Sequence, residues 1–392
     1  MGAEVVSLGC RLNLAESEGL RAMLAGEDDL VVINSCAVTA EALRQTRQAI
    51  RRARRARPDA RLLVTGCAAE VERAALAAMP EVDGLVANPA KLDPRAWNVP
   101  APSAPRAPSA HHTRAFVAVQ NGCDHACTFC VIPQGRGPSR SLPVAAVIAE
   151  AEAALALGAR EVVLTGVDLT SWGHDLPGAP RLGALVAALL AALPGLGRLR
   201  LSSVDGVEMD EALIELVASE PRVMPHLHLS LQHGADLILK RMKRRHSRAD
   251  ALALVAGLKA RRPEIAIGAD LIAGFPTETE AHHAENLSII AALGIVHGHI
   301  FPYSQRPGTP AALMPQVPAP VIRARAAALR AAVSAERAAW LAGLVGTPLA
   351  VLAERGGTGH APHFAPVALP EGTAPGTLLT LTPTHISEGL LA

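Results

Sequence analysis

The sequence of 392 residues contains few aromatic side chains: five Phe, three Trp and one Tyr. A surface that holds single-stranded nucleic acid by stacking bases on aromatic rings therefore has little material here. The chain also lacks an excess of either charge, with 37 Lys and Arg against 36 Asp and Glu. Because no overall field attracts a polyanion, any contact with nucleic acid must come from local basic clusters.

Export and membrane signals are also missing. Residues 1–20 show no basic segment followed by an uninterrupted apolar run, so we find no signal peptide. The longest apolar run, around 182–193, is too short to span a bilayer. We therefore expect a cytoplasmic protein whose six cysteines are reduced, which makes them candidate metal ligands or nucleophiles and not disulfide partners.

The first 90 residues repeat one pattern three times. "AEVVSLGC", "DLVVINSC" and "ARLLVTGC" are short apolar runs that end in a cysteine and precede a helix-like stretch. Alternating strands and helices predict a parallel sheet, with Cys10, Cys36 and Cys67 at the carboxyl ends of its strands, the edge where such sheets bind ligands. Any one of these cysteines could equally be a buried structural residue. Their three equivalent positions favour a shared site.

The rest of the chain divides by composition. A Pro-rich segment, 89–113, predicts an extended linker. Six strand-like runs then alternate with helices and predict a partial parallel barrel with its site on the carboxyl-end face: "FVAVQ", "EVVLT", "RLRLSS", "LHLSL", "IAIGADLI" and "IVHGHIF". A long helix, 318–345, precedes a small β unit. The predicted fold is α/β, with domains at 1–88, 114–345 (barrel and trailing helix) and 346–392.

Three more cysteines follow the first barrel strand directly. Cys123, Cys127 and Cys130 have the spacing C-x3-C-x2-C, with no fourth cysteine nearby. A structural zinc site normally closes with four ligands, and His125 would be strained as a co-ligand inside the loop. Three thiolates on one loop suit a [4Fe–4S] cluster with one open iron, although a structural zinc or iron–sulfur site remains the alternative.

This cysteine loop, with Phe129 before its third cysteine, resembles the signature of radical S-adenosylmethionine (SAM) enzymes. The resemblance implies that SAM chelates the open iron and that the reduced cluster cleaves it to a 5′-deoxyadenosyl radical. "LTGVD" is similar to the family's loop for the SAM amino group, and "DLIAGFPTETE" to its element near the SAM adenine. The SAM-binding residues that the resemblance implies are Phe129, Thr165, Gly166, Gln232 and Asp270.

The whole arrangement resembles the methylthiotransferases, through "SLGCRLNLAESEGL", "VVINSCAVT", "VTGCAAE", "LHLSLQHGADLILKRMKRRHS" and "FPYSQRPGTPAA". The resemblance implies a second [4Fe–4S] cluster on Cys10, Cys36 and Cys67, a sulfur source, an electron donor and a small C-terminal module of the TRAM type. The loop "NGCDHACTFCVIPQGRGPSRS" most resembles the branch that inserts a methylthio group at C2 of N6-threonylcarbamoyladenosine, next to the tRNA anticodon at position 37. Isopentenyladenosine in tRNA and a ribosomal-protein aspartate stay open as substrates. A non-catalytic RNA-binding metal protein is the alternative of another class.

Two basic clusters are candidates for contact with the tRNA anticodon stem-loop, although a charge run is more often a solvated face. The first lies in "EALRQTRQAIRRARRAR" and the second in "KRMKRRHSR". With one arginine after the sixth strand, the candidate residues are Arg44, Arg47, Arg51, Arg54, Lys240, Lys243, Arg244 and Arg306. The C-terminal module of the resembled family looks basic, whereas residues 346–392 have Arg355 as their only Arg or Lys. We expect this module to add little affinity for RNA.

Overall fold

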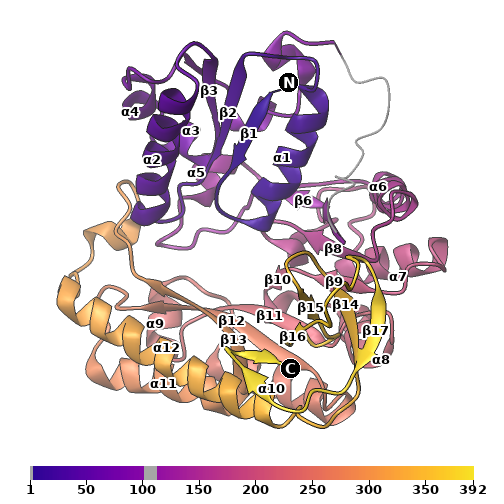
Figure 1. Ribbon diagram of the computed structural model, residues 1–392. Helices are drawn as coiled ribbons and strands as arrows, with labels where there is room; N and C mark the ends of the chain where they lie inside the picture. The colour runs from indigo at the N-terminus through magenta and orange to yellow at the C-terminus, as the bar shows by residue number, and fades with distance from the viewer. Residues whose placement is uncertain (1–2, 101–112) are drawn as a thin grey trace.

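The computed structural model describes residues 3–100 and 113–392. The N-terminal unit is a parallel sheet in the order β1-β2-β3-β4, which confirms the predicted parallel α/β unit (Figure 1). Its strands are β1 (Glu4–Ser7), β2 (Leu30–Ser35), β3 (Arg61–Gly66) and β4 (Gly84–Leu85). Its helices are α1 (Arg11–Met23), α2 (Ala40–Ala56), α3 (Cys67–Val71) and α4 (Arg73–Ala77).

Local signals account for these elements. Strand β2 is buried along its whole length, as its unbroken apolar run requires for a central parallel strand. Helix α2 begins after Thr39, whose hydroxyl accepts a hydrogen bond from the Ala42 N–H at 3.0 Å. Its apolar stripe, with Leu43 and Ile50, packs on the sheet, so its arginines are left on the opposite face.

The segment after this sheet differs from the extended linker that the Pro content predicts. Residues 88–97 form two 3-10 turns, η1 (Asn88–Ala90) and η2 (Pro94–Trp97). Between them Lys91 is buried, and the Trp97 indole N–H donates to its carbonyl at 2.8 Å. The prediction was wrong for this part because the Pro residues open turns that pack against the N-terminal sheet. Residues 101–112 of the predicted linker lie outside the described residues.

The central unit is an incomplete barrel of parallel strands, as expected. It runs β5-β8-β9 and then β10-β11-β12-β13, with the third strand position divided between β9 and β10. The strands are β5 (Arg114–Ala118), β8 (Glu161–Thr165), β9 (Leu199–Leu201), β10 (Ser203–Val204), β11 (His226–Gln232), β12 (Ala266–Ala273) and β13 (Ile295–Pro302). A short antiparallel pair, β6 (Gln120–Asn121) and β7 (Arg140–Ser141), brackets the second cysteine cluster.

Six helices cover the outer face of the barrel: α6 (Val144–Ala156), α7 (Leu182–Ala192), α8 (Glu211–Ser219), α10 (Arg248–Arg261), α11 (Glu280–Leu293) and α12 (Ala319–Ala342). The unit also contains the short helices α5 (Ile132–Arg136) and α9 (Asp236–Arg241) and the turns η3 (Leu169–Ser171), η4 (Gly206–Glu208) and η5 (Pro310–Leu313). Alternate residues of β11, such as Leu227 and Leu229, join the apolar core beneath these helices. By strand alternation, His226 and His228 face the barrel interior.

The C-terminal unit is a six-stranded sheet, mostly antiparallel, which confirms the predicted small β module. Its strands are β14 (Leu349–Ala353), β15 (Thr358–His360), β16 (Pro366–Ala368), β17 (Leu378–Leu381), β18 (Ile386–Ser387) and β19 (Leu390–Leu391). The Arg114–Glu354 ion pair, 2.8 Å long, ties it to the barrel. No helix of the described residues is long and apolar enough to cross a membrane.

Candidate active site between two cysteine triads

The first triad assembles at one edge of the N-terminal sheet. Cys10 precedes α1, Cys36 follows β2 and Cys67 begins α3 after β3, so all three lie at the carboxyl ends of neighbouring parallel strands. Cys10 is exposed and the other two are buried. Burial, together with the nearby Cys10 and Cys67, raises the pKa of Cys36 to about 11. The fold therefore brings together three cysteines that are 26 and 31 residues apart in sequence.

The second triad occupies the loop between β6 and β7. Burial raises the pKa of Cys123 to about 12 and that of Cys130 to about 11, and the other cysteines of the loop contribute to both increases. Cys130 Sγ accepts the Ile132 N–H at 3.4 Å. N–H groups directed at sulfur are a common feature of iron–sulfur ligand loops.

Each triad fits a [4Fe–4S] cluster by its donor chemistry. The raised pKa values show that thiolates in this setting are disfavoured, mainly by burial and also by nearby negative charge that includes the neighbouring cysteines, and bound iron would stabilise them. Three protein ligands also leave one iron open to a small ligand.

The two triads share one interface. Helix α5, which follows Cys130, packs against α3, which begins at Cys67. A Cβ on Gly135 would lie 3.2 Å from the Cys67 Cβ, so this close approach favours glycine. Asn88 holds the same turn by donating to the Gly135 carbonyl at 2.5 Å. The arrangement places the two candidate cluster sites on facing edges of the two units.

A buried ionic network joins the same units. Glu16 of α1 accepts hydrogen bonds from Arg136 at 2.9 Å and from Lys91 at 2.5 Å. Burial by itself would raise the pKa of Glu16, but the two cations outweigh it and lower the pKa. Sequence reasoning missed this network. The position of Glu16 on the apolar face of α1, between Ala15 and Ser17, is the signal that could have revealed it.

The SAM-binding candidates lie at two levels of the barrel. Thr165, Gly166 and Gln232 are at the carboxyl ends of β8 and β11, near the second triad. Phe129 packs edge-on against Phe275, with ring centroids 6.2 Å apart.

Asp270 lies deeper, in the middle of β12. His228 Nε2 lies 2.9 Å and His299 Nδ1 3.0 Å from its Oδ1. Burial would raise the pKa of Asp270, but the hydrogen bonds from these histidines lower it. A direct role for Asp270 with SAM stays a prediction, as do the roles of the four candidates above it.

Asp168 and Arg244 hold the second cysteine loop; Asp168 was not among the predicted site residues, and Arg244 was predicted as an RNA contact. Asp168 Oδ2 lies 2.6 Å from His125 Nε2, and its hydrogen bond raises the pKa of His125 to about 10. Arg244 pairs with Asp205 at 2.7 Å and directs Nη1 at Cys127 Sγ, 3.7 Å away. The loop is therefore attached to both β8 and the segment after β11. "LTGVD" marked Asp168 only as part of a motif.

The basic candidates fall into three settings. Lys240 and Lys243 are exposed, and their side chains form no hydrogen bond or ion pair within the described part of the chain. The four candidate arginines of α2 each lie beside an acid: Arg44 beside Glu41, Arg47 beside Glu72, Arg51 beside Glu81 and Arg54 beside Asp83. The side chain of Arg244 is 7% exposed, and Arg306 is buried, 3.8 Å from Glu72. The geometry thus favours the two lysines as surface contacts, and contact with RNA stays a prediction for all eight residues.

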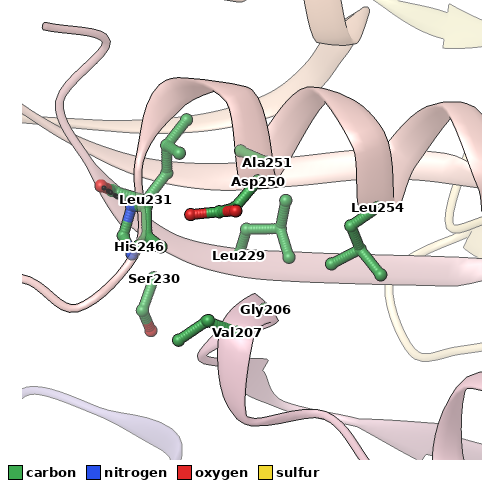
Figure 2. A pocket seen from close by; sticks show the side chains of 9 residues that line it. All are labelled: Gly206, Val207, Leu229, Ser230, Leu231, His246, Asp250, Ala251 and Leu254. Atoms are coloured by element: carbon green, nitrogen blue, oxygen red, sulfur yellow. Dashed lines mark hydrogen bonds between the residues drawn. The ribbon is translucent and has the colours of Figure 1, made fainter. Parts of the chain in front are cut away.

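A recess between β11 and α10 lies outside this site. Figure 2 shows its lining, which includes Leu229, Leu231 and Leu254. Its volume of about 40 Å³ has room for a few water molecules and not for a nucleoside. Because Leu229 and Leu231 belong to the outward face of β11, the recess is separate from the barrel interior.

In a comparison with known proteins, the segments that contain the two triads each match a known sequence family. A family described as the radical SAM superfamily matches residues 117–288, and one described as uncharacterized protein family UPF0004 matches residues 3–87. The threonylcarbamoyladenosine tRNA methylthiotransferase MtaB of Rickettsia prowazekii is 41% identical over 99% of this chain and 96% of its own length. The tRNA-2-methylthio-N(6)-dimethylallyladenosine synthase of Cereibacter sphaeroides is 36% identical over 90% and 87%.

One further relative and one solved structure extend the comparison. MtaB of Aquifex aeolicus is 36% identical over 83% of this chain and 86% of its own length. The radical SAM methyltransferase TsrM from Kitasatospora setae, solved with tryptophan and a SAM analogue, superposes with a TM-score of 0.55 at 18% identity, over 76% of this chain and 67% of that one. This last likeness concerns the fold.

Proposed function

The chain belongs to the radical SAM methylthiotransferases, and from that premise we propose that it inserts a methylthio group at C2 of N6-threonylcarbamoyladenosine, next to the anticodon at position 37 of tRNA. The relative with 41% identity carries the name of that reaction. The 36% identical synthase of Cereibacter sphaeroides has a name that specifies dimethylallyladenosine, another name for isopentenyladenosine. That nucleoside is therefore the second candidate substrate.

The observation that carries the proposal is the α3–α5 contact, which joins the segments that bear the two cysteine triads. Insertion of sulfur into a C–H bond needs a hydrogen-abstracting group and a sulfur source near the same carbon. The approach of Gly135 to Cys67 at the α3–α5 contact supports one shared site for both. Two [4Fe–4S] clusters, on Cys10, Cys36 and Cys67 and on Cys123, Cys127 and Cys130, together with SAM, would supply the radical chemistry and the sulfur.

The protein's own residues position and enclose these groups. Arg244 directs an N–H at Cys127 Sγ, and Asp168 fixes the loop through His125. The Glu16–Arg136 ion pair joins the N-terminal unit to the barrel unit. Thr165, Gly166 and Gln232 are the candidates to bind SAM at the carboxyl ends of the strands, with Phe129 beside them. An electron donor and an external sulfur source complete the proposal, as turnover consumes both electrons and sulfur.

Iron content tests the two-cluster arrangement. After anaerobic reconstitution, the wild-type chain is expected to bind about eight irons, as two four-iron clusters require. Two matched variants, Cys123/Cys127/Cys130→Ala and Cys10/Cys36/Cys67→Ala, are each expected to bind about four. The second variant should still cleave SAM under reduction but should transfer no methylthio group. A wild type with about four irons that the first variant loses completely would contradict the proposal.

Nucleoside analysis tests the substrate. Mass spectrometry of tRNA from a deletion strain should show threonylcarbamoyladenosine without its methylthio group, and the wild-type gene should restore that group. The methylthio derivative of isopentenyladenosine is the internal control and should not change. Loss of this derivative instead would assign the second candidate substrate, and an unchanged tRNA would contradict both.

A further inference from the structure

Three guanidinium groups surround one aromatic ring at the barrel interior. The ring is that of Phe364, in the turn between β15 and β16 of the C-terminal sheet. Its centroid lies 4.8 Å from Cζ of Arg200, 5.1 Å from that of Arg114 and 5.9 Å from that of Arg11. His360 stacks on the same ring at 4.4 Å. All three units of the chain therefore contribute to this cluster.

The positive charges of the cluster are not fully matched. Arg200 pairs with Glu161 at 2.8 Å, and Arg114 pairs with Glu354 at 2.8 Å. Within residues 3–100 and 113–392, the side chain of Arg11 forms neither a hydrogen bond nor an ion pair, and its ring contact is with Phe364. The carboxylates that act on it through space, Glu161 and Asp270, are already bound, Glu161 by two arginines and Asp270 by two histidines. Arg11 is thus a largely enclosed cation with no carboxylate in direct contact.

A guanidinium nitrogen of Arg200 also lacks a partner. Arg200 is 1% exposed, and its Nη1 has no hydrogen-bond partner although the other two guanidinium nitrogens bind Glu161. A buried donor left unpaired costs free energy, so its retention indicates a partner that arrives with a ligand. Both Arg200 and Arg11 contact the Phe364 ring, which makes the surroundings of that ring complementary to an anion.

The position of Arg11 relates this cationic pair to the reaction. Arg11 follows Cys10 directly and opens α1, a helix that packs beside the barrel strand β5. An anion held by Arg11 would therefore lie at the junction of the first cysteine triad and the barrel. Such a site suits the end of a substrate whose reacting carbon must reach both triads.

We propose that Arg11, supported by Arg200, binds the threonyl carboxylate of N6-threonylcarbamoyladenosine and so selects this nucleoside. The inference rests on the proposed function and deepens it. A guanidinium matches a carboxylate with two parallel hydrogen bonds, whereas a dimethylallyl or isopentenyl group has no acceptor for it. In adenine, only N1 separates C6 from C2, so binding of the N6 substituent also sets the position of C2. A nucleoside without the carboxylate leaves the enclosed guanidinium unpaired and is rejected.

Binding of modified anticodon stem-loops to the reconstituted holoenzyme tests the assignment without turnover. The probes are a stem-loop with threonylcarbamoyladenosine, the same stem-loop with its threonyl carboxylate as a methyl ester, and one with isopentenyladenosine. By fluorescence anisotropy at one salt concentration, the wild type should bind the free acid at least about tenfold more tightly than the ester. Arg11→Gln should remove this preference and leave ester binding unchanged, and Arg11→Lys should keep part of it.

The matched control is Arg21→Gln, the same substitution on the same helix at a residue that pairs with Glu18. It should keep the full preference for the free acid. Circular dichroism and iron content equal to those of the wild type show that the Arg11 variants are folded. The inference is overturned if Arg11→Gln retains the preference or if the wild type has none. Failure of the proposed function would show separately in the nucleoside analysis. In that case, threonylcarbamoyladenosine would keep its methylthio group when the gene is deleted.

Discussion

Replacement of Glu16 by Gln is expected to weaken the join between the N-terminal unit and the barrel more than any other single change in that interface. One carboxylate oxygen accepts hydrogen bonds from Arg136 at 2.9 Å and Asn121 at 3.1 Å, and the other accepts from Lys91 at 2.5 Å and Arg136 at 3.1 Å. Glu16, Lys91 and Arg136 are each no more than 2% exposed. Without the carboxylate, two cations stay buried with no opposing charge, which costs about 3–5 kcal/mol.

Lys91→Met is the matched control because it changes the charge balance in the other direction. It leaves one carboxylate against the Arg136 guanidinium and replaces the lysine chain with an apolar side chain of similar length. The loss comprises the hydrogen bonds from Lys91 to Glu16 and to Asn34, at 2.5 and 3.3 Å. We expect a cost of about 1–3 kcal/mol, smaller than that of Glu16→Gln.

Urea unfolding under anaerobic conditions, followed by far-UV circular dichroism, measures both free energies. Limited proteolysis reports the same weakening locally, as faster cleavage between the N-terminal sheet and β5. The reasoning would be refuted if Glu16→Gln were no more destabilising than Lys91→Met, because the argument depends on two unopposed cations and not on the number of hydrogen bonds lost.

Three further predictions follow from the geometry. Burial would raise the pKa of Glu161, but its arginine partners lower it from 4.5 to about 2. Its contribution to stability is therefore present above pH 4.5 and lost as the pH falls towards 2. In Glu161→Gln, the free energy of unfolding, measured with urea, should depend less on pH across that interval. A pH dependence equal to that of the wild type would contradict this. Gly122→Ala places a Cβ 1.9 Å from the Pro138 carbonyl at a φ of +76°, and should cost the second triad its irons while the first triad keeps about four. Lys240→Ala/Lys243→Ala should reduce the salt dependence of stem-loop binding by about 0.7 in log–log slope for each phosphate contact removed, and an identical slope would exclude phosphate contact by these lysines.

Much of the fold was predictable because its signals are local. Each strand–Cys–helix repeat in the N-terminal unit carries its own apolar run, and the barrel strands are separated by helical periodicity, so the parallel α/β class and the small C-terminal sheet followed from pattern alone. The extended linker was wrong over residues 88–97, where the packing of Lys91 and Trp97 against the sheet outweighs a Pro-rich composition.

The candidate site divides in the same way. The spacing of Cys123, Cys127 and Cys130 requires only one loop, so the sequence was enough to indicate a three-thiolate ligand set. Arg244 of the second basic cluster and Arg306 after the sixth strand carry charges that the sequence suggests are at the surface, but the side chain of Arg244 is 7% exposed and Arg306 is buried. Whether a charged side chain meets solvent or a partner depends on contacts between segments that no local pattern encodes.

By itself, then, the sequence indicated the six candidate ligands, the α/β class and the resemblance to methylthiotransferases, since each depends on spacing within one short segment or on a repeated one. Only the tertiary structure decided that Gly135 meets Cys67, that Glu16 is held between two cations, and that Arg11 lies unpaired beside Phe364. Arg11 and Phe364 are 353 residues apart in the chain. Their proximity comes from the docking of three folded units, and the balance of buried charge exists only once that docking is complete.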